Sequence, residues 1–322
     1  MPEWLVERGL GETRSALIDG GEIVEARIEL EGVIAAGAIA SARLVDIGRN
    51  GRNAVARDGA GTEYLLPRGA SGATEGAEIM IEITRSAIPG AEPWKRPLAR
   101  LQHQRPPHRP ERTEEFGRRE LSLPATKDEL SKAGWDDLME QARTGLVPFA
   151  GGELWISPTP AMTLVDVDGY LAPDELAMLG ASEAAKAIRR LDIGGSIGID
   201  LPTSGSKSAR QRAAEAIDAE LPQPFERTAV NGFGFVQIVR PRSRASLVEL
   251  AGDRAAFEAR ALLRRVAFEP PGPKRLVAHP AVVGVLQGQP DWLELLAGPT
   301  GGAVSLRAEP NLPMSGGYAE KA

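Results

Sequence analysis

The stretch AMTLVDVDGYLAPDELAMLGASEAAKAIRRLDIGGSIGID (161–200) decides the fold of the middle of this chain. It contains two apolar runs, 161–168 and 193–200, separated by a segment that is typical of a helix. This segment, 173–190, starts with proline and carries lysine and arginine in its last turn, as helices favour at these two ends. A helix that connects two strands in this way allows them to lie parallel as neighbours. We therefore expect a strand–helix–strand unit.

Three aspartates lie at the ends of these two expected strands. Side chains alternate along a strand, so Asp166 and Asp168 share a face, and Asp200 ends the second strand. Carboxyl ends of neighbouring strands are where open α/β sheets usually form their sites. Two carboxylates converging there would repel each other unless a cation lay between them, and Mg²⁺ is typically held by one or two carboxylates with waters and phosphates. The pattern allows a magnesium site at Asp166 and Asp200, with Mn²⁺ as a substitute ion, but aspartates at strand ends more often simply cap a helix or turn, so the spacing alone does not decide between the two.

The flanking sequence predicts a multidomain α+β chain. Short apolar runs separated by glycines indicate strands before residue 87, and helical patterns alternate with strands after residue 127. We expect N-terminal strands packing on the core (1–35), a small β-barrel (36–86), a basic proline-rich linker (87–126), a mixed α/β core (127–250) with a first helix at 127–143, and a small α/β C-terminal domain (251–322).

The linker has a distinct composition. Between residues 85 and 119, nine lysines and arginines face four glutamates, and six prolines exclude a long helix. One interpretation is a solvated linker. The other is a basic arm that follows a phosphate backbone, with Trp94 available for stacking on a base.

Whole-chain composition excludes several classes of protein. Lys and Arg number 38 against 44 Asp and Glu, a net charge of -6, so any nucleic-acid surface must be local. The absence of cysteine excludes disulfides, thiolate zinc sites and cysteine nucleophiles, and fits a reducing compartment. Charged residues near the N-terminus and the lack of a long apolar run predict a soluble, cytoplasmic protein that does not enter a membrane.

Three blocks of sequence carry a family resemblance. They are VPFAGGELWISPTPAMTLVDVDG (147–169), ASEAAKAIRRLDIGGSIGIDL (181–201) and NGFGFVQIVRPRSRASL (231–247). Together they resemble the catalytic region of the ribonuclease E/G family. Matched residue by residue, this resemblance implies that Asp166 and Asp200 are metal ligands. Asp168 takes the place of an asparagine that orients the metal shell and the scissile phosphate.

The N-terminal half is similar to the same family more loosely. Residues 36–86 resemble its inserted OB-fold module, with Val55 and Leu65 at the positions of two stacking phenylalanines and Tyr64 nearby as a candidate RNA contact. Residues 253–312 are similar to its small C-terminal domain. The chain is shorter than the family pattern: it lacks residues assignable to the sensor of an RNA 5′-monophosphate, and without cysteine any oligomer must form without the family's zinc link.

Four basic residues are candidate contacts to the RNA backbone. They are Lys207, Arg210, Arg240 and Arg242, and the alternative for each is a solvated face. The resemblance implies a magnesium-dependent endoribonuclease that cleaves single-stranded RNA with an activated water, leaving 5′-phosphate and 3′-hydroxyl ends, in RNA processing, including that of ribosomal RNA, or in RNA decay. The rival interpretation is an RNA-binding protein that has lost catalysis; against it, a buried acidic pair without a metal is costly to keep. A third is a nuclease that acts on DNA.

Overall fold

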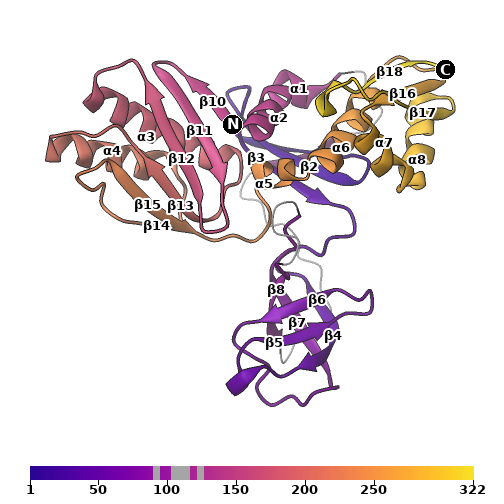
Figure 1. The fold of residues 1–322 in the computed structure, drawn as a ribbon, viewed down its shortest axis with the longest axis horizontal. Helices are drawn as coiled ribbons and strands as arrows, with labels where there is room; N and C mark the ends of the chain where they lie inside the picture. Colours follow the sequence, from indigo (N-terminus) through magenta and orange to yellow (C-terminus); the bar gives the residue numbers. More distant parts are fainter. Residues whose placement is uncertain (90–94, 103–116, 122–126) are drawn as a thin grey trace.

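The computed structural model describes residues 1–89, 95–102, 117–121 and 127–322. Its strands form three open sheets and one closed barrel. In Figure 1 the barrel stands below two larger lobes, one built on a six-stranded sheet and the other on the C-terminal helices. No helix in these ranges is long and apolar enough to cross a lipid bilayer.

A four-stranded sheet lies at the N-terminus. Its strands are β1 (Glu3–Arg8), β2 (Glu12–Asp19), β3 (Glu22–Leu30) and β9 (Gly117–Leu121), in the order β3-β2-β1-β9. The expected three strands are confirmed, and β2 and β3 are joined at Gly20 and Gly21, which both have positive φ. The fourth strand was not expected: β9 pairs in parallel with β1 and lies within the range predicted to be a linker.

The barrel is closed by five strands. These are β4 (Ile39–Asp46), β5 (Ala54–Arg57), β6 (Glu63–Leu66), β7 (Glu78–Arg85) and β8 (Leu98–Gln102), in the order β4-β5-β6-β8-β7. The prediction of a small barrel is confirmed, but its last strand comes from the predicted linker, because β8 is the element that bridges β6 and β7. The remaining parts of that linker, including Trp94, lie outside the described residues.

The central unit contains a six-stranded sheet. Its strands are β10 (Leu146–Phe149), β11 (Gly152–Pro158), β12 (Thr163–Gly169), β13 (Gly195–Asp200), β15 (Phe235–Arg240) and β14 (Glu226–Arg227), in that order across the sheet. Its helices are α1 (Glu129–Lys132), α2 (Trp135–Thr144), α3 (Pro173–Arg190), α4 (Lys207–Glu220) and α5 (Leu247–Gly252). The predicted strand–helix–strand unit is confirmed: β12 and β13 are parallel neighbours joined through α3. The single helix predicted at 127–143 is wrong, because Gly134, at φ +97°, separates α1 from α2.

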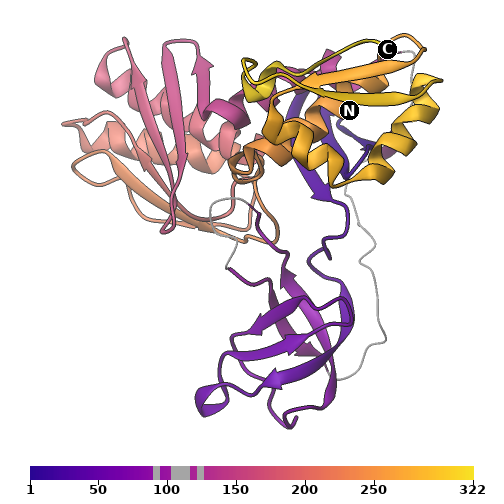
Figure 2. The same ribbon diagram turned by 45° about the vertical axis from the view of Figure 1, so that its right-hand side comes forward.

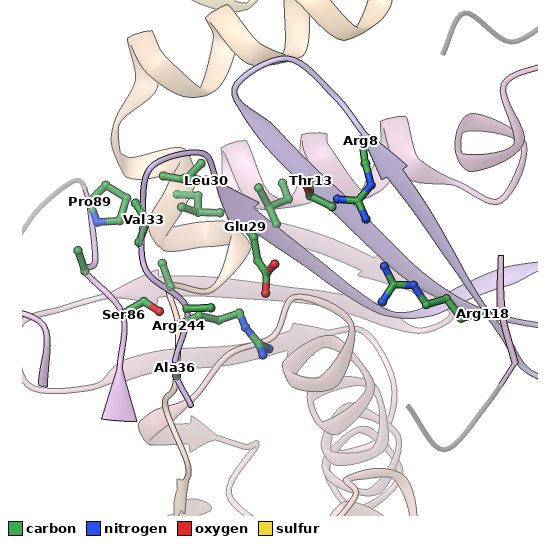
Figure 3. A pocket seen from close by; sticks show the side chains of 15 residues that line it. Arg8, Thr13, Glu29, Leu30, Val33, Ala36, Ser86, Pro89, Arg118 and Arg244 are labelled. Atoms are coloured by element: carbon green, nitrogen blue, oxygen red, sulfur yellow. The ribbon is translucent and has the colours of Figure 1, made fainter. Parts of the chain in front are cut away.

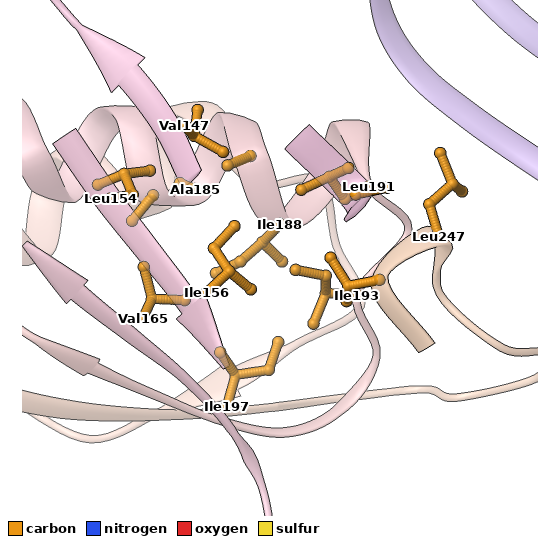
Figure 4. Close-up of a cluster of buried hydrophobic side chains, with 14 of the residues drawn as sticks. Val147, Leu154, Ile156, Val165, Ala185, Ile188, Leu191, Ile193, Ile197 and Leu247 are labelled. Atoms are coloured by element: carbon orange, nitrogen blue, oxygen red, sulfur yellow. The ribbon is translucent and has the colours of Figure 1, made fainter. Parts of the chain in front are cut away.

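In the part of the chain that the structure describes, helices cover one face of the six-stranded sheet. Figures 1 and 2 show α3 and α4 on the same side of this sheet. Figure 4 shows the side chains that fill this interface, including Leu154, Ile156 and Val165 from the strands and Ile188 from α3. Burying each such side chain contributes roughly 1.5–3 kcal/mol. The alternate residues of the same strands therefore face away from the core.

The C-terminal unit has its own hydrophobic core. It consists of α6 (Arg254–Ala267), β16 (Lys274–Ala278), α7 (Pro280–Gln287), α8 (Pro290–Thr300), β17 (Val304–Ala308) and β18 (Tyr318–Lys321), with its sheet in the order β17-β16-β18. Buried ion pairs join α6 to the N-terminal sheet. Arg260 contacts Glu12 at 2.8 Å, and Arg264 contacts Glu7 at 2.9 Å.

Candidate metal centre on an open sheet face

Asp166 and Asp200 lie directly beside each other. They end the ladder between β12 and β13, where each is the register partner of the other. Neighbouring strands are about 4.8 Å apart, and partners in register point to the same face. Both side chains are exposed, whereas Val165 and Ile199, the preceding partners, are buried against α3. The expected convergence of these two carboxylates is therefore present in the fold.

Aromatic residues flank this pair on both sides. Trp155 on β11 is the register partner of Asp166, and Phe235 on β15 is the register partner of Asp200. A single row across the open face thus reads Trp155, Asp166, Asp200, Phe235. One step further along β12, Asp168 is exposed and is paired with Glu153. The centre is an acidic patch on two strands whose outer neighbours, β11 and β15, each carry an aromatic residue.

The electrostatics of this patch leave negative charge uncompensated. Burial, followed by the neighbouring charges of Asp168 and Asp200, raises the pKa of Asp166 above its usual value. Across the described ranges, none of the three aspartates forms an ion pair with a lysine, arginine or histidine. A cation placed between Asp166 and Asp200 would lower the repulsion that raises this pKa.

The donor set fits magnesium. Mg²⁺ is usually bound by one or two carboxylates, while waters and substrate phosphates complete its shell. Within the part of the chain that the structure describes, no three acidic or histidine residues form a metal-binding cluster, so a cage made entirely of protein is not present. Asp166 and Asp200 could supply the two carboxylates, and Asp168 is placed to act on waters of the shell.

The exposure of these aspartates corrects one premise drawn from the sequence. We expected a buried acidic pair whose retention without a metal would be costly. Asp166 and Asp200 are instead solvent-exposed at the open face, so water can screen their repulsion in the absence of an ion. The cost of keeping them therefore does not argue against a protein that has lost catalysis.

Two of the predicted cationic contacts lie just after Asp200. Lys207 is exposed at the first turn of α4, whose N-terminus favours anions. Arg210, one turn further, donates a hydrogen bond to the backbone oxygen of Ser204 at 2.8 Å and is half-buried. Of these two residues, Lys207 is the one whose side chain can reach a phosphate, because Arg210 is already bonded to the backbone.

Arg240 and Arg242 lie elsewhere than the sequence suggested. Arg240 is on the helix-covered side of β15 and donates to the carbonyl oxygen of Ile193 at 3.2 Å, while burial lowers its pKa. Arg242 comes after the end of the strand and forms an ion pair with Glu249 on α5. Both side chains stabilise the fold, and neither is brought to the aspartates.

Tyr64 is also placed differently from the expectation. It lies inside the barrel at 2% exposure, and its hydroxyl donates to Asp58 at 2.8 Å. Because side chains alternate along β6, Leu65 points outward and pairs with Val55 on β5. Tyr64 therefore cannot stack on a base, and Tyr64 is the single aromatic residue of the barrel strands.

A cavity of about 470 Å³ lies apart from the aspartates, between the N-terminal sheet and the base of the barrel. Figure 3 shows Arg8, Arg118 and Arg244 on its wall. Each of these arginines already has a carboxylate partner: Glu120 contacts both Arg8 and Arg118, and Asp192 contacts Arg244. The candidate centre is therefore an open surface and not this cavity.

Trp155 and Phe235 were not among the residues predicted to lie at this site. The signal was present in ELWIS (153–157), where alternation places Trp155 opposite the buried face. What the sequence alone lacked was the register, because only the pairing of β11 with β12 places this side chain beside Asp166.

Comparison with known proteins adds a partial similarity. No protein-family model matches this chain. A segment of 110 residues is 33% identical to ribonuclease G of Escherichia coli (strain K12) and of Shigella flexneri, and 32% identical to that of Salmonella typhimurium (strain SL1344). Part of this chain is similar to ribonuclease G. The match covers 30% of this chain and 22% of ribonuclease G, and it agrees with the ribonuclease E/G resemblance carried by the sequence blocks.

Proposed function

We propose that this chain is a magnesium-dependent endoribonuclease related to ribonucleases E and G, with its metal at Asp166 and Asp200. The observation that carries the proposal is the in-register pair of exposed aspartates at the parallel β12–β13 edge, in a chain partly similar to ribonuclease G. The proposed substrate is single-stranded RNA. The proposed products carry 5′-phosphate and 3′-hydroxyl ends, a polarity taken from the family resemblance.

Each part of the fold has a proposed role. The barrel (39–102) would be an OB-fold module that holds RNA by its backbone, since its outer face carries Val55 and Leu65 in place of aromatic platforms. The central unit (127–250) would be the nuclease core, supported by the N-terminal strands (1–35), and residues 251–322 a small C-terminal domain. Cutting should not depend on the 5′ phosphate of the RNA, because no residues are assignable to its sensor.

The chemistry at the site divides between the ion and the chain. When bound, Mg²⁺ would polarise a phosphoryl oxygen and make a water more acidic. Asp166 and Asp200 would hold the ion, and Asp168 would accept hydrogen bonds from water on the same face. Lys207 at the start of α4 compensates charge on a neighbouring phosphate. The open sheet face admits a flexible strand without requiring it to enter a cavity.

An RNA-cutting assay with matched variants tests the proposal. A labelled single-stranded RNA is incubated with magnesium and wild type, Asp200→Asn or Asp137→Asn. Asp137 is an exposed aspartate on α2 and serves as the control. We expect Asp200→Asn to reduce cutting by at least about 100-fold, since a metal ligand is lost, and Asp137→Asn to cut like wild type. Cutting by Asp200→Asn at the wild-type rate would overturn the assignment.

A second candidate function is an RNA-binding protein without catalysis. The exposure of the aspartates favours it, because they can persist without an ion at little cost. Calorimetry with magnesium separates the two functions. If the chain is a nuclease, wild type should bind magnesium and Asp166→Asn should lose this binding. An inactive RNA-binding protein does not need to bind magnesium at all.

A further inference from the structure

We propose that Trp155 and Phe235 form a base-stacking platform for single-stranded RNA on the open face of the six-stranded sheet. This inference rests on the proposed function and adds to it the contacts that hold the bases beside the reacting phosphate. Aromatic side chains can stack on any base, so such a platform binds single strands with little sequence preference.

The register places one aromatic residue on each of the two strands that flank the acidic pair. Trp155 is partnered with Asp166 and Phe235 with Asp200, so the backbone positions of these four residues form one row, from which the Phe235 ring extends over Gly198 on β13. With strands about 4.8 Å apart, the Cα atoms of Trp155 and Phe235 are about 14 Å apart across four strands.

The floor of the platform is apolar next to this row. The ring of Phe235 lies over Gly198, since a Cβ at Gly198 would come within 2.5 Å of its Cζ atom and within 3.1 Å of Leu164. Gly198 thus leaves the space that the ring of Phe235, a partly buried residue, occupies beside Leu164. Any larger residue at position 198 would collide with the ring of Phe235, which explains why this position is glycine.

Trp155 is held in place but remains accessible. Its indole Nε1 donates to Glu153 at 2.9 Å, which satisfies the polar edge of the ring. The residue is nevertheless 46% exposed. A tryptophan so exposed on a sheet face is available to a planar ligand.

RNA is the occupant that the surrounding residues favour. The acidic residues Asp166, Asp168 and Asp200 repel both a second copy stacked face to face and an RNA backbone, but the proposed ion at Asp166 and Asp200 would also bind a phosphate and so would compensate this charge for RNA. Stacking on the barrel has no support, since its strands carry a single aromatic residue and Tyr64 is buried. Polar side chains, Ser157 and Gln237, lie between the apolar ones on the open face and can hydrogen-bond base edges or ribose.

Binding of an oligonucleotide tests the platform independently of cutting. The dissociation constant of a fluorescein-labelled twelve-residue oligoadenylate is measured by anisotropy, with calcium in place of magnesium, for wild type, Trp155→Ala, Trp155→Phe and Tyr318→Ala. Tyr318, 44% exposed on β18, is the matched control. We expect Trp155→Ala to raise Kd about 5- to 100-fold, Trp155→Phe to raise it much less, and Tyr318→Ala to leave it unchanged. With an abasic oligomer of the same length, Trp155→Ala and wild type should bind equally.

The outcomes separate this inference from the proposed function. Equal Kd values for wild type and Trp155→Ala on oligoadenylate would overturn the platform, even if Asp200→Asn abolishes cutting. If Trp155→Ala weakened binding of the abasic oligomer as much as binding of oligoadenylate, the platform would also be overturned, because the substitution would then affect contacts to phosphates and not to bases. Dissociation of a dimer by Trp155→Ala in sedimentation, with RNA binding unchanged, would instead assign the face to a second copy. If binding falls as expected while Asp200→Asn still cuts, the platform stands and the metal assignment fails.

Discussion

Replacing Arg264 by methionine tests how the C-terminal unit is held on the rest of the chain. Arg264 projects from α6, and its side chain is 4% exposed. It donates to Glu7 on β1 at 2.9 and 3.1 Å and to Asp128, at the start of α1, at 2.6 and 2.9 Å. Arg264→Met preserves much of the buried aliphatic volume and removes these four charge-assisted hydrogen bonds.

The expected loss follows from the charges that remain. The buried cluster contains three cations (Arg14, Arg260, Arg264) and three carboxylates (Glu7, Glu12, Asp128). Removing one cation leaves one carboxylate without compensation, and breaking a buried pair costs about 3–5 kcal/mol. Because Arg14 remains 2.8 Å from Glu7, we expect the lower end, about 3 kcal/mol in the free energy of unfolding.

Urea unfolding at pH 7, followed by tryptophan fluorescence, measures this loss. Trp135 is buried beside the cavity that Glu12, Arg14 and Arg264 also line, so its fluorescence reports on the cluster. The control is Arg275→Met, which removes a pair at 3.5 Å from a 44% exposed side chain and should lose under about 1 kcal/mol. Adding Asp128→Asn to Arg264→Met should recover part of the loss, since Asp128 is the carboxylate left without a cation and asparagine keeps the N-cap acceptor. Equal losses in Arg264→Met and Arg275→Met would refute the reasoning.

Further predictions concern pH and the basic residues. Burial acts to raise the pKa of Asp128, but hydrogen bonds from Arg264 and Ser131 outweigh it and the folded pKa lies below the ordinary 3.8. The stability that this carboxylate contributes is therefore present above pH 3.8 and is lost as the pH falls below about 4. Asp128→Asn keeps an N-cap acceptor, so in urea unfolding wild type should be more stable than this variant at neutral pH and no more stable below about pH 4. A stability difference that grows as the pH falls would contradict this prediction. Arg240→Met should lose about 1–3 kcal/mol of stability with unchanged Kd for RNA, whereas Lys207→Ala should keep its stability and weaken RNA binding in a salt-dependent way. Weaker RNA binding by a fully folded Arg240→Met would show that this arginine faces the substrate.

Local signals in the sequence predicted the central unit well. The helix 173–190 was predicted with the bounds observed, because proline at its start and arginines at its end mark the limits of a single local element. The parallel pairing of β12 and β13 followed from that crossover. The positions of the two aspartates relative to each other could therefore be predicted from the sequence, since both residues lie at the ends of strands in one local unit.

Features that depend on long-range pairing were not predictable. The strand β8 follows a proline in a basic segment, and it becomes a strand because the barrel needs it between β6 and β7. The inward direction of Tyr64 depends on which face of β6 lines the barrel core. Arg242 was expected to be a candidate contact to RNA, but it pairs with Glu249 on the helix that follows β15, a partner the local sequence does not reveal.

The central claim is that Asp166 and Asp200 hold the divalent ion used to cut RNA. Anomalous scattering from a crystal soaked in manganese tests it most directly, because Mn²⁺ accepts the same oxygen ligands as Mg²⁺ and can be located unambiguously. We predict one anomalous peak between the two carboxylates in wild type, and its absence in Asp200→Asn crystals soaked in the same way. A wild-type crystal with no peak there at saturating manganese, or with the peak at other residues, would contradict the account.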